Sequence, residues 1–228
     1  MTSERTNGEY GEYIAVPASG SGPGVLVLHA WWGLTDVFRG VCDRLAAAGF
    51  VALAPDLYGG VTASTIEEAE RSVERLDDAV ARATILDALY HLRAHPGVRD
   101  TPVAVVGFSL GAAYAYWLST ERPDAVAAVV VYYGTSDPDA NYARARAAYL
   151  GHYAADDPYE PAEGVRQMEA ALRAAGRDVA FHTYPGTGHW FAEDNRPDAY
   201  NADAAALAWE RTLAFLREHL TTTGSKGA

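Results

Sequence analysis

The sequence predicts an α/β fold, in which a doubly wound, mainly parallel sheet carries helices on both faces. Three observations support this class. Apolar strand-like runs alternate with helical patterns along the chain, which is typical of βαβ units. Residues 25–29 and 127–133 are almost continuously apolar, as strands buried on both faces are. Residues 107–111 read Gly-Phe-Ser-Leu-Gly between β-forming and helix-compatible runs.

The elements follow one another in a regular order. Strand-like segments, which are apolar and bounded by Gly, Pro or polar turns, cover residues 9–16, 25–29, 50–54, 103–106, 127–133, 149–154 and 179–184. Helical segments cover residues 35–48, 65–95, 112–118, 161–175 and 199–220. We expect two helices within 65–95, with a break near Asp77. In the last helix, the expected core residues are Leu207, Leu213, Phe215, Leu216 and Leu220.

Length and composition set the class of protein. A chain of 228 residues, 49% hydrophobic and 21% charged, can form one domain with a substantial core. We expect a single domain over residues 1–228, with a flexible polar leader (1–8) and a flexible tail (221–228). The net charge of −12 argues against nucleic acid or an anionic membrane as a partner.

Cysteine usage and apolar runs indicate the compartment. Cys42 is the one cysteine of the sequence, so no intramolecular disulfide can form, and a reducing compartment is expected. Its helical pattern predicts that Cys42 packs in the core. The first residues lack the apolar segment of a secretory signal, and the longest apolar run, 125–133, is too short to span a bilayer. These features predict a cytoplasmic protein.

The Gly-x-Ser-x-Gly run has the strand-to-helix context of a nucleophile elbow. Such a turn holds the serine backbone in a strained conformation, so small residues are needed two positions before and after it, where strand and helix pass closely. The Ser109 hydroxyl then stands at a helix N-terminus, where free N–H groups and the helix dipole favour developing negative charge. Ser109 is therefore the candidate nucleophile.

A serine nucleophile needs a base, and the base needs a carboxylate. His189 lies in a glycine-rich turn directly after the last predicted strand, at the sheet edge where reactive groups gather. Asp157 follows the preceding strand and is the favoured acid, with Asp156 and Asp137 as alternatives. The chain order of Ser109, Asp157 and His189 is that of an α/β-hydrolase.

The oxyanion formed on attack at a carbonyl needs two N–H donors. The Leu110 N–H, directly after the nucleophile, is one candidate. The second is expected in the loop after residues 25–29, where we favour the Trp31 N–H. Residues with metal-ligand spacing do not converge on a convincing site, so no metal or organic cofactor is implied.

Taken together, these segments resemble the dienelactone hydrolase family of the α/β-hydrolase superfamily. The resemblance covers residues 10–220 and rests on VLVLHAWWG, VALAPDLYGG, GFSLGA, LGHYAADDPYEP and FHTYPGTGHWF, in the order of the family. It implies an α/β-hydrolase fold, a monomer, Ser109 as nucleophile, Asp157 as acid and His189 as base. It also matches Trp31 and Leu110 to the oxyanion donors of the family.

The sequence departs from archetypal family members at three positions. They have a cysteine where this chain has Ser109, and a glutamate where it has Ala30. These two changes agree chemically, because a serine can be deprotonated by histidine during attack and needs no resting thiolate. Where family members have a substrate-binding arginine, this chain has Glu193. The resemblance thus implies a neutral ester or lactone rather than an anionic one.

The sequence therefore predicts a serine esterase or lactonase that acts on a small molecule through an acyl-enzyme. Tyr133, Tyr159 and Trp190 flank the predicted reactive groups and are candidates for lining an acyl or alcohol pocket. Two alternatives stay open. The same triad can act on a thioester, an amide or a carbon–carbon bond, or the chain can be a non-catalytic hydrolase-fold ligand-binding protein.

Overall fold

The computed structural model describes residues 4–7, 11–99 and 102–220. It consists of two compact units, Met1–Val103 and Ala104–Ala228. Most of its strands are joined by helices, as the alternation in the sequence predicts. The prediction of a single domain stays a prediction.

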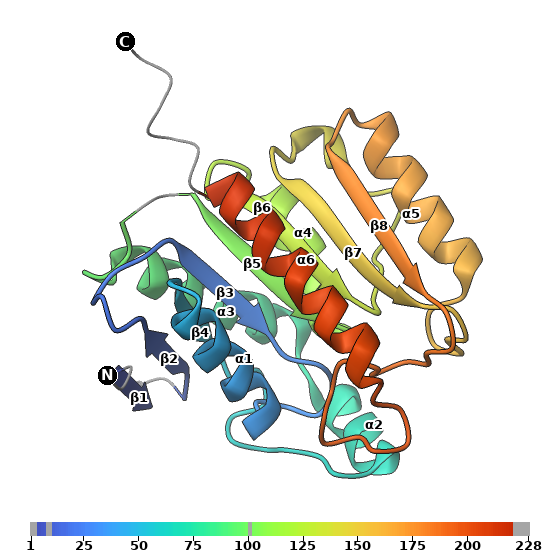
Figure 1. Cartoon of the computed structure of the whole chain (residues 1–228), viewed down its shortest axis with the longest axis horizontal. Helices are drawn as coiled ribbons and strands as arrows, with labels where there is room; N and C mark the ends of the chain where they lie inside the picture. Colours follow the sequence, from blue (N-terminus) through green and yellow to red (C-terminus); the bar gives the residue numbers. More distant parts are fainter. Residues whose placement is uncertain (1–3, 8–10, 100–101, 221–228) are drawn as a thin grey trace. The chain divides into compact units, whose positions relative to one another are not determined.

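The first unit combines a four-strand arrangement with three helices (Figure 1). Its elements are β1 (Glu4–Asn7), β2 (Tyr13–Val16), β3 (Gly24–Leu28), α1 (Asp36–Ala47), β4 (Val51–Ala54), α2 (Ile66–Arg75) and α3 (Asp78–Ala94). The strands lie in the order β1-β2-β4-β3. β3 and β4 pair in parallel, whereas β2 pairs antiparallel with both β1 and β4. Helices α1 and α3 pack on opposite faces of these strands.

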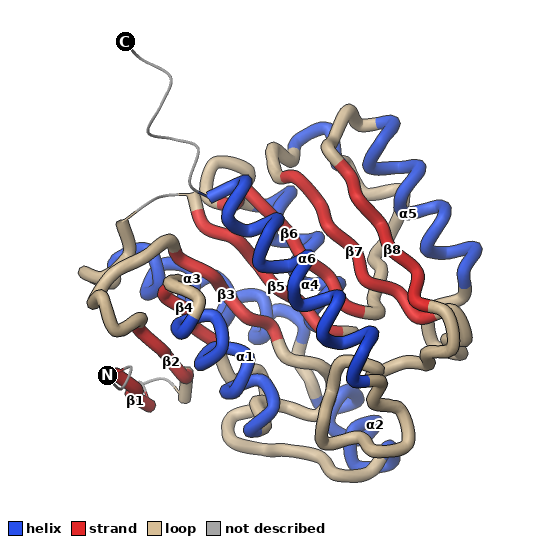
Figure 2. Tube along the Cα trace, in the orientation of Figure 1, coloured by secondary structure: helices blue, strands red, loops and turns tan. Residues whose placement is uncertain are grey.

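The second unit contains strands in the order β5-β6-β7-β8. Its elements are β5 (Val103–Phe108), α4 (Leu110–Glu121), β6 (Val126–Tyr132), a 3₁₀ turn (Tyr142–Arg144), β7 (Ala148–Ala154), α5 (Ala162–Ala174), β8 (Val179–Tyr184) and α6 (Ala202–Leu220). β6, β7 and β8 pair in parallel. Consequently, the loops that follow β7 and β8 lie together at one edge of the strands (Figure 2).

Burial explains why these segments form strands. Every residue of β3, β5 and β7 is buried, and continuous apolar sequences suit strands that are covered on both faces. Cys42 on α1 is also fully buried, as its helical pattern predicts.

The predicted break near Asp77 is confirmed and has a local cause. Helix α2 ends at Arg75, and Asp77 becomes the N-cap of α3. The Asp77 carboxylate accepts hydrogen bonds from the N–H groups of Ala79 and Val80, at 2.9 and 3.1 Å. Because these N–H groups have no acceptor within the helix, the carboxylate starts a new helix at this point.

The backbone of β1 pairs with β2 from Glu4 to Asn7, and the flexibility expected for the leader 1–8 stays a prediction. The tail expected to be flexible lies outside the described residues. One expectation from the sequence needs correction. In α6, Leu207 is 42% exposed, while Ala208 and Thr212 are fully buried. The buried face of α6 instead follows a spacing of four residues from Ala208 to Leu220, which includes a threonine that hydropathy alone does not select.

Candidate functional site

Ser109 occupies the turn between β5 and α4 in a strained conformation. Its φ and ψ angles are 48° and −111°, a region that non-glycine residues rarely adopt. The Ser109 N–H donates to the carbonyl of Tyr132 at 2.9 Å, which ties the turn to the end of β6. A Cβ atom at Gly107 would lie 2.4 Å from the Gly111 carbonyl oxygen. The close passage of strand and helix therefore requires glycine there.

His189 follows β8 and reaches the serine. Its Nε2 atom lies 2.9 Å from the Ser109 Oγ. The turn that carries His189 is held at two points, because the Thr187 hydroxyl donates to the Tyr184 carbonyl at 2.7 Å and the Asp156 N–H donates to the Thr187 carbonyl at 3.0 Å. The imidazole is thus positioned by the ends of both β7 and β8.

Asp157 completes a hydrogen-bonded series. Its Oδ2 and Oδ1 atoms lie 2.7 and 2.9 Å from the His189 Nδ1, and the two side chains are only 1% and 4% exposed. Asp157 also accepts from the N–H groups of Tyr159 and Glu160, at 2.9 and 3.1 Å. With Nδ1–H bound to a carboxylate, the His189 Nε2 atom is the acceptor that faces the serine hydroxyl.

The two alternative acids have other partners. Asp156 is exposed, and its backbone contacts the Thr187 turn. The Asp137 Oδ1 atom accepts from the Asp139 N–H at 2.9 Å. Among the three candidates, the structure brings Asp157 to His189.

Three aromatic rings surround the His189 imidazole. The centroids of Tyr133, Tyr159 and Trp190 lie 5.0, 5.0 and 5.1 Å from its own. Tyr159 and Trp190 also contact each other at 5.2 Å. Tyr159 is 45% exposed, whereas Tyr133 is fully buried. The structure therefore gathers all three candidate pocket residues, with Tyr159 on the solvent side and Tyr133 on the inner side.

A buried acidic residue lies behind Tyr133. The Tyr133 hydroxyl donates to Glu193 Oε1 at 2.9 Å, and Glu193 is 1% exposed. Burial and the neighbouring Glu193 charge raise the pKa of Tyr133 well above its usual value, so the phenol stays protonated and remains a donor. The family resemblance drew attention to Glu193, but no signal in the sequence indicated its hydrogen bond to Tyr133.

Glu160 is a further residue of this site that sequence reasoning missed. It lies three residues after Asp157, and its carboxylate accepts from the Thr135 hydroxyl at 2.7 Å. Burial raises the pKa of Glu160 above its usual value, against the effect of the Thr135 hydrogen bonds and of the His189 charge. Its spacing of three residues from Asp157 is the one signal in the sequence that points to it.

The two expected oxyanion donors lie in different units. Leu110 is the first residue of α4, so its N–H has no acceptor within the helix. Trp31 lies in the first unit, after β3. There the buried His29 braces the loop, with Nδ1 2.7 Å from the Ala30 carbonyl oxygen and Nε2 accepting from the Leu57 N–H at 3.1 Å. The role of Trp31 stays a prediction.

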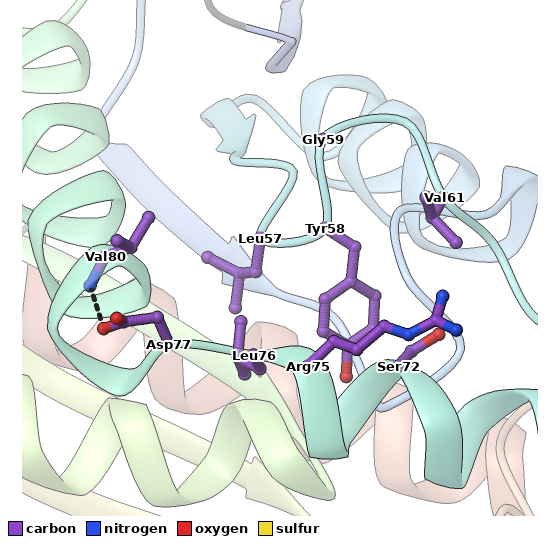
Figure 3. Close-up of a pocket in the computed structure, with 9 residues that line it drawn as sticks. All are labelled: Leu57, Tyr58, Gly59, Val61, Ser72, Arg75, Leu76, Asp77 and Val80. Carbon is purple, nitrogen blue, oxygen red and sulfur yellow. Dashed lines mark hydrogen bonds between the residues drawn. The ribbon is translucent and has the colours of Figure 1, made fainter.

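The first unit also contains a cavity of about 350 Å³ (Figure 3). It is lined by Leu57, Tyr58, Gly59, Val61, Ser72, Arg75, Leu76, Asp77 and Val80. These residues come from the loop after β4 and from the junction of α2 and α3. The cavity is mainly apolar. None of the predicted site residues lines it.

Over residues 4–7, 11–99 and 102–220, no group of three or more His, Cys, Asp or Glu side chains is arranged to hold a metal ion. Within the same ranges, no helix combines the length and apolarity needed to cross a bilayer.

The parallel strands and the strained serine between strand and helix define an α/β-hydrolase fold, as the sequence predicts. Comparison with known proteins supports this class. The model of the dienelactone hydrolase family matches residues 11–220. The chain belongs to the dienelactone hydrolase family, whose members include enzymes named for lactone hydrolysis.

Individual relatives cover nearly the whole chain. The chain is 33% identical to protein usf of Aquifex pyrophilus, with 92% of this chain and 93% of the relative covered. It is 32% identical to a probable 2-oxo-3-(5-oxofuran-2-ylidene)propanoate lactonase of Bradyrhizobium sp., with 94% and 92% covered. A dienelactone hydrolase-like promiscuous phosphotriesterase from metagenomic libraries superimposes with a TM-score of 0.83 at 25% identity, covering 96% and 98%. Family membership places the chain among the hydrolases of esters and lactones.

Proposed function

We propose that this protein is a serine hydrolase that cleaves a small carboxylic ester or lactone through an acyl-enzyme intermediate. One observation carries the proposal. The Ser109 hydroxyl, the His189 imidazole and the Asp157 carboxylate form a continuous hydrogen-bonded series with distances of 2.9 and 2.7 Å. This series supplies the nucleophile, the base and the orienting acid that acyl transfer needs.

In the first half-reaction, the Ser109 Oγ attacks the carbonyl carbon while its proton passes to the His189 Nε2. The imidazolium that forms is stabilised by the Asp157 carboxylate. The C–O bond to the alcohol then breaks, and His189 returns the proton to the leaving oxygen. A water molecule attacks the acyl-enzyme in the same way, which releases the carboxylic acid and restores the serine hydroxyl.

Negative charge develops on the carbonyl oxygen in both half-reactions. We propose that the N–H groups of Leu110 and Trp31 stabilise it, with support from the positive end of the α4 dipole. Loss of one such donor typically lowers the rate by about 10²–10³-fold. Tyr159, Trp190 and Tyr133, which contact the His189 ring, are proposed to line the space for the acyl or alcohol part.

The test compares wild type with Ser109→Ala in hydrolysis of p-nitrophenyl butyrate and in labelling by a fluorophosphonate. We expect Ser109→Ala to lose both, while Ser19→Ala, at a serine whose hydroxyl donates to the nearby Ser21 carbonyl, retains both. Equal hydrolysis by wild type and Ser109→Ala would reject the assignment. Labelling of Ser109 without ester hydrolysis would favour action on a thioester, amide or carbon–carbon bond. Absence of both in wild type would favour a ligand-binding protein.

We also propose that the protein acts in the cytoplasm as a monomer. The single cysteine, Cys42, is fully buried and unpaired with another cysteine, as suits a reducing compartment. The monomer follows from the family resemblance alone. Light scattering coupled to size-exclusion chromatography checks the mass against the 24.4 kDa of one chain.

A further inference from the structure

We infer that Glu160 is a second carboxylate of this site, which Thr135 holds in place and which stabilises the imidazolium formed on His189. The inference deepens the proposed function and rests on it, because it concerns the proton transfer at the same histidine. Glu160 takes no part in that transfer itself. It acts through His189 and is therefore a positioning residue, whereas Asp157 orients the ring.

Glu160 and Asp157 lie in one loop after β7. The Asp157 Oδ1 atom accepts from the N–H groups of Tyr159 and Glu160, at 2.9 and 3.1 Å. The Asp157 Oδ2 atom lies 2.7 Å from the His189 Nδ1. The ring of Tyr159, which lies between the two carboxylates in the chain, is 5.0 Å from the imidazole. The Glu160 backbone is therefore bonded to the same carboxylate that binds His189.

The side chain of Glu160 is held by the loop after β6. Its Oε2 atom accepts from the Thr135 hydroxyl at 2.7 Å, and the Thr135 N–H also bonds to the carboxylate. Two residues before Thr135, the ring centroid of Tyr133 lies 5.0 Å from that of the imidazole. A Cβ atom at the intervening Gly134 would lie 2.6 Å from the Ser109 carbonyl oxygen. The Glu160 carboxylate is thus fixed by a loop that packs against both the histidine and the nucleophile.

His189 is the cation that this carboxylate faces. The ionisable groups that interact electrostatically with Glu160 are Asp157 in its own loop, Tyr153 on β7 and His189 after β8. Burial raises the pKa of Tyr153, so its phenol stays neutral, and an ionised Asp157 is negative. Among the described residues that act on Glu160, His189 is therefore the one that can become positive.

The ionisable groups that contact His189 within this unit add no positive charge. Its Nδ1 atom is bonded to the Asp157 carboxylate. The rings of Tyr133 and Tyr159 lie 5.0 Å from the imidazole, and burial together with Glu193 raises the pKa of Tyr133, which keeps that phenol neutral. The second carboxylate therefore adds its negative charge to that of Asp157.

Negative charge beside the imidazole has two consequences. It stabilises the imidazolium that forms as the serine proton is transferred, which raises kcat. It also favours the imidazolium of the free enzyme, so a higher pH is needed to obtain the neutral base. Because Glu160 is half-buried, an effective dielectric constant of about 35 applies, and at about 10 Å one such charge stabilises the imidazolium by about fivefold, or about 0.7 pH units.

The experiment measures kcat and kcat/KM for p-nitrophenyl butyrate in Glu160→Gln between about pH 5 and about pH 9. The amide oxygen can still accept from Thr135, so the charge is lost while the hydrogen bond is kept. We expect kcat to fall by up to about fivefold and the midpoint of the acidic limb of kcat/KM to move down by about 0.7 pH units. Glu163→Gln, which removes an exposed carboxylate bonded to Arg166 on α5, should change neither.

Glu160→Asp separates the charge from the hydrogen bond in the opposite sense. Its side chain is one methylene shorter, so it keeps the charge and weakens the bond to Thr135. The midpoint of the acidic limb should stay nearer to wild type in Glu160→Asp than in Glu160→Gln. A purely structural role would give the reverse order of activities, with Glu160→Gln close to wild type, and would move neither midpoint.

A folded Glu160→Gln enzyme whose acidic limb does not move would overturn the inference, whatever its kcat. An equal movement in Glu163→Gln would also overturn it, because the effect would then belong to the net charge of −12. Hydrolysis that persists in Ser109→Ala would instead reject the proposed function. If hydrolysis depends on Ser109 but the limb stays in place, the proposed function stands and the role of Glu160 fails.

Discussion

Replacing Asp157 by asparagine is the sharpest test of the proposed hydrogen-bonded series. The substitution keeps the shape of the side chain, and the amide oxygen can still accept from the N–H groups of Tyr159 and Glu160. What disappears is the negative charge 2.7 Å from the His189 Nδ1. An amide can also donate to Nδ1, which would place the proton on Nε2, where it cannot accept the Ser109 proton.

The magnitude follows from the geometry of the pair. The Asp157 and His189 side chains are 1% and 4% exposed, so solvent screens their interaction little. When the imidazolium forms, two opposite charges about 4 Å apart attract by about 4 kcal/mol at an effective dielectric constant of about 20. Loss of that attraction in the transition state lowers kcat by about 10³-fold. A wrong tautomer would lower it further.

The assay is the steady-state kcat for p-nitrophenyl butyrate, with circular dichroism to check that each variant is folded. Asp156→Asn is the matched control, because Asp156 is the exposed neighbour of Asp157, and it should stay within about twofold of wild type. A folded Asp157→Asn enzyme that keeps more than a tenth of wild-type kcat would refute the reasoning. A large loss in Asp156→Asn alone would reassign the acid.

Two further predictions concern the scaffold of the site. In Gly134→Ala, the new Cβ would lie 2.6 Å from both the Ser109 carbonyl oxygen and the Ala112 Cβ, so we expect a lower kcat. The control is Gly164→Ala, whose new Cβ meets nothing within 4 Å; it should keep its kcat and gain about 0.5–1 kcal/mol of stability. Equal kcat values for the two variants would mean that the turn at Ser109 tolerates displacement by the new methyl group. Burial lowers the pKa of His152 well below its usual value, so below about pH 6.5 the unfolded chain binds a proton that the folded chain does not. The free energy of unfolding, fully retained above about pH 6.5, therefore falls by up to about 1.4 kcal/mol per pH unit below it. Urea unfolding at about pH 7 and about pH 5.5 should show a smaller loss in His152→Gln; an unchanged loss would assign the acid sensitivity to other groups.

Local signals predicted most of the fold. Apolar runs and turn residues located the strands, and the carboxylate of Asp77 explains the break between α2 and α3. The prediction failed where packing outweighs local preference. In α6, Leu207 is exposed while Thr212 is buried, because the Thr212 hydroxyl bonds to Tyr132 and His152.

Part of the candidate site was likewise predictable from local sequence, and part was not. Gly107 and Ser109 were recognisable because the turn between β5 and α4 imposes its own residue types at fixed spacing. The choice between Asp156 and Asp157 was not decidable from local sequence, since adjacent residues in a loop point in different directions. The structure brings Asp157 to His189 and leaves Asp156 exposed.

By itself, the sequence determined the class of fold, the serine at the strand–helix turn and the histidine after the last strand. Each of these depends on short-range chemistry: hydropathy, turn geometry and helix capping. Only the tertiary structure decided which carboxylate meets His189 and that Glu193 is buried against Tyr133. The physical reason is that hydrogen bonds between residues 32 and 60 positions apart depend on strand order and loop packing, which no local pattern records.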